Sequence, residues 1–495
     1  MNRKLFTAFI CTATLTLAAG CGQGELCGEA CGPDSDPPVE VDPETDPEIE
    51  EGMTALRVVH ASPDAPAIDV WIEGADAPII ENLSYGDATD YAMVASDNYP
   101  IALRVSPSTA NDTPVYEGWL NLESQHRTTT IAAGLIGSAA SADKFRILKV
   151  DEGFGPADNG SAIMRVVHAG ADAPTVGIDL HDDDPTAPEI SGLDRFTSSD
   201  AAGFAINAGE VQQVGITASG GRVTAFTTPE LPGGAELFVI ATGLTGKLAR
   251  EQDGFALLAV GPEGSLGFIR QNPVVYALHG SPDAPPVDGF VGETELFSLS
   301  FGELSDGIQV PPGAYDVDFY PASPGVERPD GDPAVSANTQ SLEPGERYLT
   351  IATGLLSGAP NAFQLQSYAE GFDLGDPDAS RVRVVHSSPD APAVDLGIVN
   401  IEQTVSPLLV TNVSFPEATS PDGLDTGIGQ IPLGVTPAGA NDQVVASFHV
   451  TTAPGLRAFG IAAGALDPSN GASFRLLVVD TAVSPWSVAT VHPQP

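Results

Sequence analysis

Residues 57–69 read RVVHASPDAPAID, and this stretch recurs three more times along the 495-residue chain. The later copies are RVVHAGADAPTVG from Arg165, YALHGSPDAPPVD from Tyr276 and RVVHSSPDAPAVD from Arg383. Successive histidines are 108, 111 and 107 residues apart, at His60, His168, His279 and His386. Such a regular spacing predicts four tandem copies of one domain of about 100 residues.

A second signature recurs in the same register. An apolar stretch that ends in a small-residue turn appears as TIAAGLIG, VIATGLTG, TIATGLLS and GIAAGALD, with its glycine at Gly134, Gly243, Gly354 and Gly464. A closing apolar stretch follows each turn, and the first of these is FRILKV from Phe145. Each unit is therefore expected to contain an opening strand, a middle section, a strand before the glycine turn and a closing strand.

The middle sections alternate apolar and polar residues with the two-residue period of a strand that has one face in water. In residues 314–320, Val317 and Phe319 share one face, and Asp316 and Asp318 share the other. High glycine and proline contents, 53 and 43 residues, suit short strands joined by turns. About seven short strands per unit, with turn signals roughly every 8–12 residues, predict an all-β chain of four tandem β-sandwiches of immunoglobulin-like size.

The domain boundaries are placed where this periodicity stops. We expect a signal peptide over 1–20, an acidic Pro-rich tether over 21–53, β-sandwiches over 54–154, 162–261, 272–373 and 380–482, and a tail over 483–495. Because the linkers are short, neighbouring sandwiches are expected to touch and to form a semi-rigid rod. The sandwich segments contain no cysteine, so their cores must hold without disulfides.

The N-terminus has the pattern of a secretory signal, with Arg3 and Lys4 before an apolar segment that is too short to span a membrane. Its LAAGC ending resembles the bacterial lipobox, which implies a lipid anchor on Cys21. Gly22 follows instead of an aspartate, which favours the outer membrane, facing the periplasm or the cell surface. Cys27 and Cys31 could form a short disulfide in this oxidising compartment. The acidic Pro-rich residues that follow are expected to remain disordered and extended.

The net charge is −46, with a sequence pI near 4.1. Such a chain repels a phosphate backbone, so we expect no nucleic-acid partner. One interpretation of the acidity is solubility on an exposed surface. The other is that the chain binds calcium or another hard cation.

The recurring motif also has two interpretations. In the first it is a structural corner, in which the histidine donates to a turn and a Ser or Asp side chain binds backbone amides. On the opening strand, His60 and Val58 then share one face, and Arg57 and Val59 share the other. In the second, one histidine and two carboxylates within ten residues hold a divalent cation such as calcium. The residues concerned are His60, Asp64, Asp69, His168, Asp172, His279, Asp283, Asp288, His386, Asp390 and Asp395.

These residues carry a resemblance to a known family. The signature RVVHxSPDAPxVD, with the strand and AxGL turn that follow, is similar to a bacterial and archaeal extracellular family, the domain of unknown function numbered forty-three ninety-seven. The second copy departs from it, with Gly170-Ala171 for Ser-Pro and Gly177 for the second aspartate. The resemblance implies an immunoglobulin-like or transthyretin-like β-sandwich in a surface context and brings no established activity.

Four near-copies of an active site in one chain would be unusual, so we expect no enzyme and no required cofactor. The expected function is that of a structural or adhesive surface lipoprotein with an extracellular protein or glycan ligand. The alternatives are a calcium-dependent carbohydrate- or protein-binding module, and an extracytoplasmic hydrolase. Multivalent repetition favours binding or spacing, because repeats add avidity and reach without new chemistry.

Overall fold

The computed structural model describes residues 48–182, 184–325 and 327–494. This part of the chain is built from β-strands and contains no α-helix, which confirms the all-β prediction. No helix within it has the length and apolar character needed to cross a membrane. The expected signal peptide, most of the tether, and Cys21, Cys27 and Cys31 lie outside the described residues.

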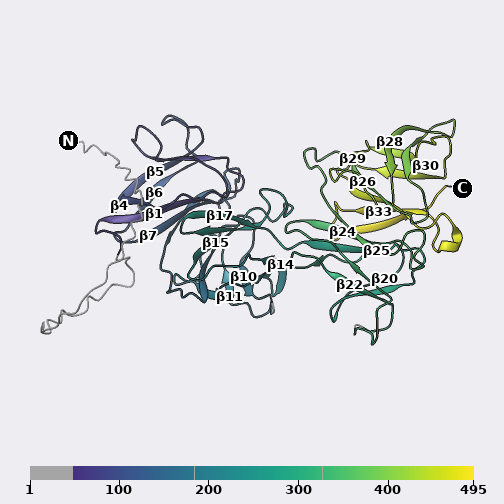
Figure 1. Cartoon of the computed structure of the whole chain (residues 1–495). Helices are drawn as coiled ribbons and strands as arrows, with labels where there is room; N and C mark the ends of the chain where they lie inside the picture. Colours follow the sequence, from purple (N-terminus) through teal and green to yellow (C-terminus); the bar gives the residue numbers. More distant parts are fainter. Residues whose placement is uncertain (1–47, 183, 326, 495) are drawn as a thin grey trace, which may run out of the picture. The chain divides into compact units, whose positions relative to one another are not determined.

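The first sandwich consists of two four-stranded sheets, ordered β4-β1-β7-β8 and β3-β2-β5-β6 (Figure 1). It has eight strands where the sequence pattern indicates about seven. The opening strand β1 runs parallel to β7, the strand before the glycine turn, and every other pairing in the two sheets is antiparallel. The strands are β1 (Met53–His60), β2 (Ile68–Ile72), β3 (Ile80–Leu83), β4 (Ala92–Ala95), β5 (Asn98–Val105), β6 (Tyr116–Asn121), β7 (Arg127–Ala133) and β8 (Arg146–Asp151).

The second sandwich repeats this order, with sheets β12-β9-β15-β16-β17 and β11-β10-β13-β14. Its opening strand β9 again runs parallel to the strand before the glycine turn, β15. The strands are β9 (Ser161–His168), β10 (Val176–Leu180), β11 (Ile190–Leu193), β12 (Phe204–Asn207), β13 (Gln213–Ala218), β14 (Gly221–Thr227), β15 (Glu236–Thr242), β16 (Ala256–Gly261) and β17 (Gly264–Ile269).

The third and fourth sandwiches have the same arrangement. The third has sheets β21-β18-β24-β25 and β20-β19-β22-β23, and the fourth has β29-β26-β32-β33-β34 and β28-β27-β30-β31. The third comprises β18 (Val274–His279), β19 (Val287–Val291), β20 (Thr294–Leu299), β21 (Ile308–Gln309), β22 (Asp316–Pro321), β23 (Val335–Asn338), β24 (Arg347–Thr353) and β25 (Gln364–Ala369). The fourth comprises β26 (Arg381–Ser387), β27 (Val394–Val399), β28 (Val405–Val413), β29 (Leu424–Asp425), β30 (Gly429–Pro437), β31 (Ala446–Thr452), β32 (Arg457–Ala463), the 3₁₀ turn η1 (Pro468–Asn470), β33 (Arg475–Asp480) and β34 (Ser487–Val491).

Two strands lie where the sequence indicates a linker and a tail. Strand β17 occupies part of the expected linker after residue 261 and pairs with β16, and β34 occupies the expected tail and pairs with β33. Gly264 and Gly267 in β17 both have positive φ. Glycines weaken the local strand signal of β17, so this strand depends on pairing with a preformed sheet edge.

Inside each sandwich the two sheets enclose an apolar core, as the alternating middle sections predict. In β22, Val317 and Phe319 are buried, while Asp316 is exposed and Asp318 is half-buried. In β1, Val58 belongs to the core between the two sheets of the first sandwich.

The sheet that contains the opening strand is also buried on its outer face. Val59 and Ile131 of the first sandwich share one hydrophobic cluster with Phe238 and Leu258 of the second. The third and fourth sandwiches share another cluster in the same way, which includes Leu349, Ile351, Phe459 and Ile461. The first sandwich therefore packs sheet against sheet on the second, and the third packs on the fourth.

Candidate functional site

The histidine of the recurring motif has the same environment in all four copies. It is at most 1% exposed, and its Nε2 donates a hydrogen bond to the carbonyl of the proline six residues later. The four distances are 3.1, 2.9, 3.0 and 3.0 Å, for the pairs His60–Pro66, His168–Pro174, His279–Pro285 and His386–Pro392. A carbonyl can only accept, so the proton resides on Nε2. Burial lowers the pKa of all four rings, which favours the neutral form.

The other ring nitrogen, Nδ1, faces the turn that follows the strand. In the first copy it accepts from the Ser62 amide at 3.3 Å, and in the fourth from the Ser388 amide at 3.4 Å. Within the described residues, Nδ1 of His168 and of His279 is buried without a hydrogen-bond partner. The neutral tautomer tolerates this because Nδ1 then carries no hydrogen.

The first aspartate of the motif holds the glycine turn of its own sandwich. Asp64 accepts from the amides of Ile136 and Gly137 at 2.9 and 2.8 Å. The corresponding amides bound by the other copies are Thr245 for Asp172, Leu356 and Ser357 for Asp283, and Leu466 and Asp467 for Asp390. Burial opposes ionisation of Asp283 and Asp390, but these hydrogen bonds hold the pKa of both carboxyls below the usual value.

The motif serine strengthens the same connection. Ser62 Oγ donates to the Gly134 carbonyl at 2.6 Å, and Ser281 and Ser388 do the same to Gly354 and Gly464. The second copy has Gly170 at this position and lacks the bond, while Asp172 still binds the turn. The two sequence signatures are therefore two halves of one hydrogen-bonded corner.

The second aspartate binds a different part of the sandwich. Asp69 accepts from the Asn82 and Ser108 amides, both at 2.8 Å, and Asp395 accepts from Asn412 and Gly439 at 2.7 and 2.8 Å. Asp288 accepts from the Ser323 amide at 2.9 Å. Although burial opposes it, these bonds lower the pKa of Asp69. In the first and fourth copies this carboxylate connects its strand to the neighbouring edge strand, β3 or β28, and to the loop after the strand on its other side, β5 or β30.

Each copy therefore uses its histidine and its carboxylates for separate backbone groups. The histidine holds its own turn and the first aspartate holds the glycine turn. In the first, third and fourth copies the second aspartate binds amides of its own sheet. Across the described ranges, no group of three or more His, Cys, Asp or Glu side chains is arranged to hold a metal ion. The geometry corresponds to the structural interpretation of the motif.

The arginine at the start of the motif has a role that sequence reasoning missed. Arg57 is 1% exposed, donates to the Gly261 carbonyl of the second sandwich and lies 5.5 Å from the ring centroid of Phe238. Arg165 and Arg383 donate across the same kind of interface, each at 2.6 Å, to the carbonyls of Asp151 and Ala369 respectively. The third copy has Tyr276, which stacks on Trp486 of the fourth sandwich at a centroid distance of 4.2 Å. The signal available in the sequence was a positively charged residue, such as Arg57, on the strand face opposite the histidine.

Two segments of the chain, 54–179 and 273–397, match the model of a family described as Domain of unknown function (DUF4397). Together they cover just over half of the chain. The chain belongs to this family. Each DUF4397 match begins at the opening strand of one sandwich and continues through the motif of the sandwich that packs on it. No curated protein matches the chain.

Proposed function

We propose that this DUF4397 protein is a non-catalytic surface lipoprotein of the outer membrane with a structural or adhesive role. The observation that carries the proposal is the use of the motif side chains. In every copy, the histidine and the first aspartate are bonded to backbone groups of their own sandwich. A general base or a metal ligand needs a free lone pair that a substrate or an ion can reach, and the partnerless Nδ1 atoms of His168 and His279 are buried.

The repeat arrangement supports the same role. Four copies of one corner maintain four sandwiches, and the sandwiches pack in pairs through apolar sheets. A spacer or an adhesive array requires rigidity and repetition more than it requires a catalytic constellation. The proposed anchor is Cys21, which would place the acidic sandwiches outside the lipid surface.

Lipid attachment is tested by metabolic labelling with an alkyne analogue of palmitate, followed by membrane fractionation. The wild-type chain should incorporate the label and sediment with the outer membrane. The Cys21→Ser variant should lose both properties. An unlabelled wild-type chain would refute the anchor.

The non-catalytic role is tested by attachment of expressing cells to polystyrene. Glutamine retains a hydrogen-bond donor near the position of Nε2 but removes the imidazole base. A chain that carries His60→Gln, His168→Gln, His279→Gln and His386→Gln should support attachment equal to the wild type, normalised to folded protein at the surface. Loss of attachment by a folded, displayed variant would contradict a purely structural use of these rings. Asp283→Asn, which keeps the acceptor oxygen but removes the charge, provides a second test if the fourfold variant does not fold.

A further inference from the structure

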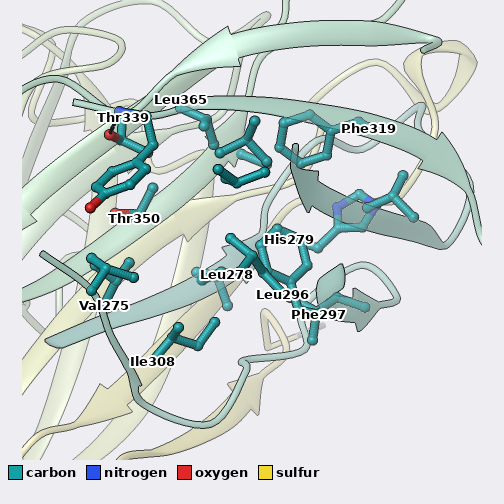
Figure 2. A pocket seen from close by; sticks show the side chains of 18 of the residues that line it. Val275, Leu278, His279, Leu296, Phe297, Ile308, Phe319, Thr339, Thr350 and Leu365 are labelled. Carbon is teal, nitrogen blue, oxygen red and sulfur yellow. Dashed lines mark hydrogen bonds between the residues drawn. The ribbon is translucent and has the colours of Figure 1, made fainter. Parts of the chain in front are cut away.

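The third sandwich contains an apolar cavity of about 250 Å³ between its two sheets. Figure 2 shows the lining side chains, with Val275 and Ile308 on one side and Leu365 and Phe319 on the other. The core cluster of this sandwich has five buried residues, whereas those of the first, second and fourth have ten, seventeen and nine. The third sandwich therefore has the smallest buried core cluster of the four.

Three of the polar groups in the lining already have partners, whereas Nδ1 of His279, which also lines the cavity, is buried without one. The Thr350 hydroxyl is 2.9 Å from the Ser367 hydroxyl, the Thr339 hydroxyl donates to the Gln340 carbonyl, and the Tyr315 hydroxyl donates to the Pro311 carbonyl. A buried water needs two to four polar partners, and these groups offer few free positions. The interior of the cavity is therefore suited to hydrocarbon and not to water.

The fourth sandwich has a matching cavity of about 270 Å³, lined by Val384, Leu396, Leu433 and Leu476 among others. The corresponding space in the second sandwich is only about 20 Å³. The same fold can thus be filled or hollow, and the difference must lie in the side chains.

One cross-strand pair contributes to the difference. The opening strand and its parallel neighbour place two side chains side by side at the same register position in each copy. In the second sandwich this pair is Val166 and Val239, and both line the residual space. In the third it is Ala277 and Thr350, and in the fourth it is Val384 and Gly460. The hollow sandwiches have lost bulk at this position, on opposite strands of the pair.

Both cavities extend to the same edge of the fold. The third is lined there by half-buried Leu296 and Phe297 of β20 and by Ile308 of β21, and the fourth by Leu409 of β28 and Leu424 of β29. The edge strands β21 and β29 have two residues each, whereas the equivalent strand β12 of the filled second sandwich has four. A shorter edge strand covers less of the gap between the sheets and leaves a route for entry.

We propose that the third and fourth sandwiches each bind one aliphatic chain of about ten carbons between their sheets, by comparison with an apolar cavity of about 150 Å³ that binds benzene. The chain enters at the edge between β20 and β21, or between β28 and β29. A polar head group stays at this mouth in water, because the lining is largely apolar apart from Nδ1 of His279 in the third sandwich. The main alternative is an empty packing defect, which would bind nothing.

The test uses residues 43–495, which form one compact unit and contain all of the hydrophobic clusters. Nonan-1-ol is titrated into this protein by isothermal calorimetry, and nonane-1,9-diol serves as the control ligand. The alcohol should bind with a stoichiometry of two. The diol should bind more weakly than the alcohol, because one of its hydroxyls would be buried with at most one partner.

Variants that add bulk inside each cavity show which sandwich binds the alcohol. Ala277→Val and Gly460→Val each fill part of one cavity, so each should weaken binding at its own site, and the double variant should weaken both sites. Ala92→Val, which adds two methyl groups at an exposed position of β4, should leave both affinities unchanged. A Cβ at position 460 lies 3.3 Å from Val382 Cγ1, so a small adjustment is needed there. If Gly460→Val does not fold, the effect of Ala277→Val alone decides. No saturable binding of nonan-1-ol, equal binding of the diol, or affinities unchanged by Ala277→Val would each overturn the proposal.

Discussion

At the residue scale, the histidines and aspartates of the motif act as fixed partners of backbone groups. His60 donates from Nε2, Asp64 accepts two amides of the glycine turn, and Asp69 accepts one amide in β3 and one after β5. The motif was predictable from sequence, and so was its use as a turn, because Ser-Pro-Asp is a turn pattern with a known mechanism. Its partner turn was not predictable as a contact, since nothing local connects residue 64 to residues 136 and 137.

The buried histidines predict a pH dependence of stability. The folded-state pKa of His60 is below the ordinary 6.5, so the unfolded chain binds more protons in acid. This contribution to stability is complete above about pH 6.5 and is lost as the pH falls, at a rate of at most about 1.4 kcal/mol per pH unit. The free energy of unfolding of His60→Gln should therefore fall less steeply than that of the wild type between about pH 6.5 and 5, as measured by urea titrations. Parallel curves for the two proteins would refute a buried neutral ring.

Replacement of the first aspartate should lower the stability of the sandwich without abolishing its fold. Asp64→Ala leaves the Ile136 and Gly137 amides without their acceptor and should lower the free energy of unfolding by about 1–2 kcal/mol. Asp76→Ala, which removes another exposed carboxylate of the same sandwich, should change it by less than about 0.5 kcal/mol. Equal effects of the two substitutions in urea unfolding would contradict the connection between the two turns.

At the element scale, the geometry of the glycine turn explains why a glycine occupies this position in all four copies. Gly134, Gly243, Gly354 and Gly464 have φ between 82° and 89°. A Cβ at each would overlap a backbone carbonyl of the segment that follows the turn, for example that of Lys144 at Gly134. Both the backbone conformation and the close approach therefore require glycine.

Substitution of two glycines of the first sandwich distinguishes the requirement for a positive φ from the requirement for space at the Cβ position. Gly134→Ala combines an unfavourable φ with a clash and should lower the free energy of unfolding by about 2–4 kcal/mol. Gly74→Ala has a similar φ of 86° but nothing within 4 Å of its Cβ, so it should lower it by only about 1 kcal/mol. Thermal or urea unfolding measures both values. A loss at Gly134 no larger than that at Gly74 would show that the clash is relieved.

Strand types differed in how well the sequence predicted them. The alternating middle strands were predictable because one of their faces meets water. The opening strand and the strand before the glycine turn are buried on both faces, as in β1 and β7, although β7 contains three threonines. Short linkers predicted that neighbouring sandwiches touch, but the sequence did not indicate which sheets make the contact.

At the scale of the whole molecule, the shared clusters make neighbouring sandwiches thermodynamic partners. Phe238 and Phe459 occupy the same register position in the second and fourth sandwiches and are fully buried in the two clusters. Removing either ring opens a cavity at a face-to-face interface of two sheets.

Calorimetry of the chain should therefore resolve two cooperative blocks, one for each pair of sandwiches. Phe238→Ala should destabilise the block of the first and second sandwiches by about 3–5 kcal/mol and leave the other transition in place. Phe459→Ala should do the reverse. Four independent transitions, or a shift of both blocks in either variant, would contradict the paired organisation.

Pairing through an apolar sheet also restricts how such a chain can change its length. Deletion or duplication of a single sandwich would leave the apolar outer face of one sheet exposed to water, and the product would aggregate or be degraded. Viable changes would then add or remove sandwiches in twos, so related chains of different length should carry an even number of these domains.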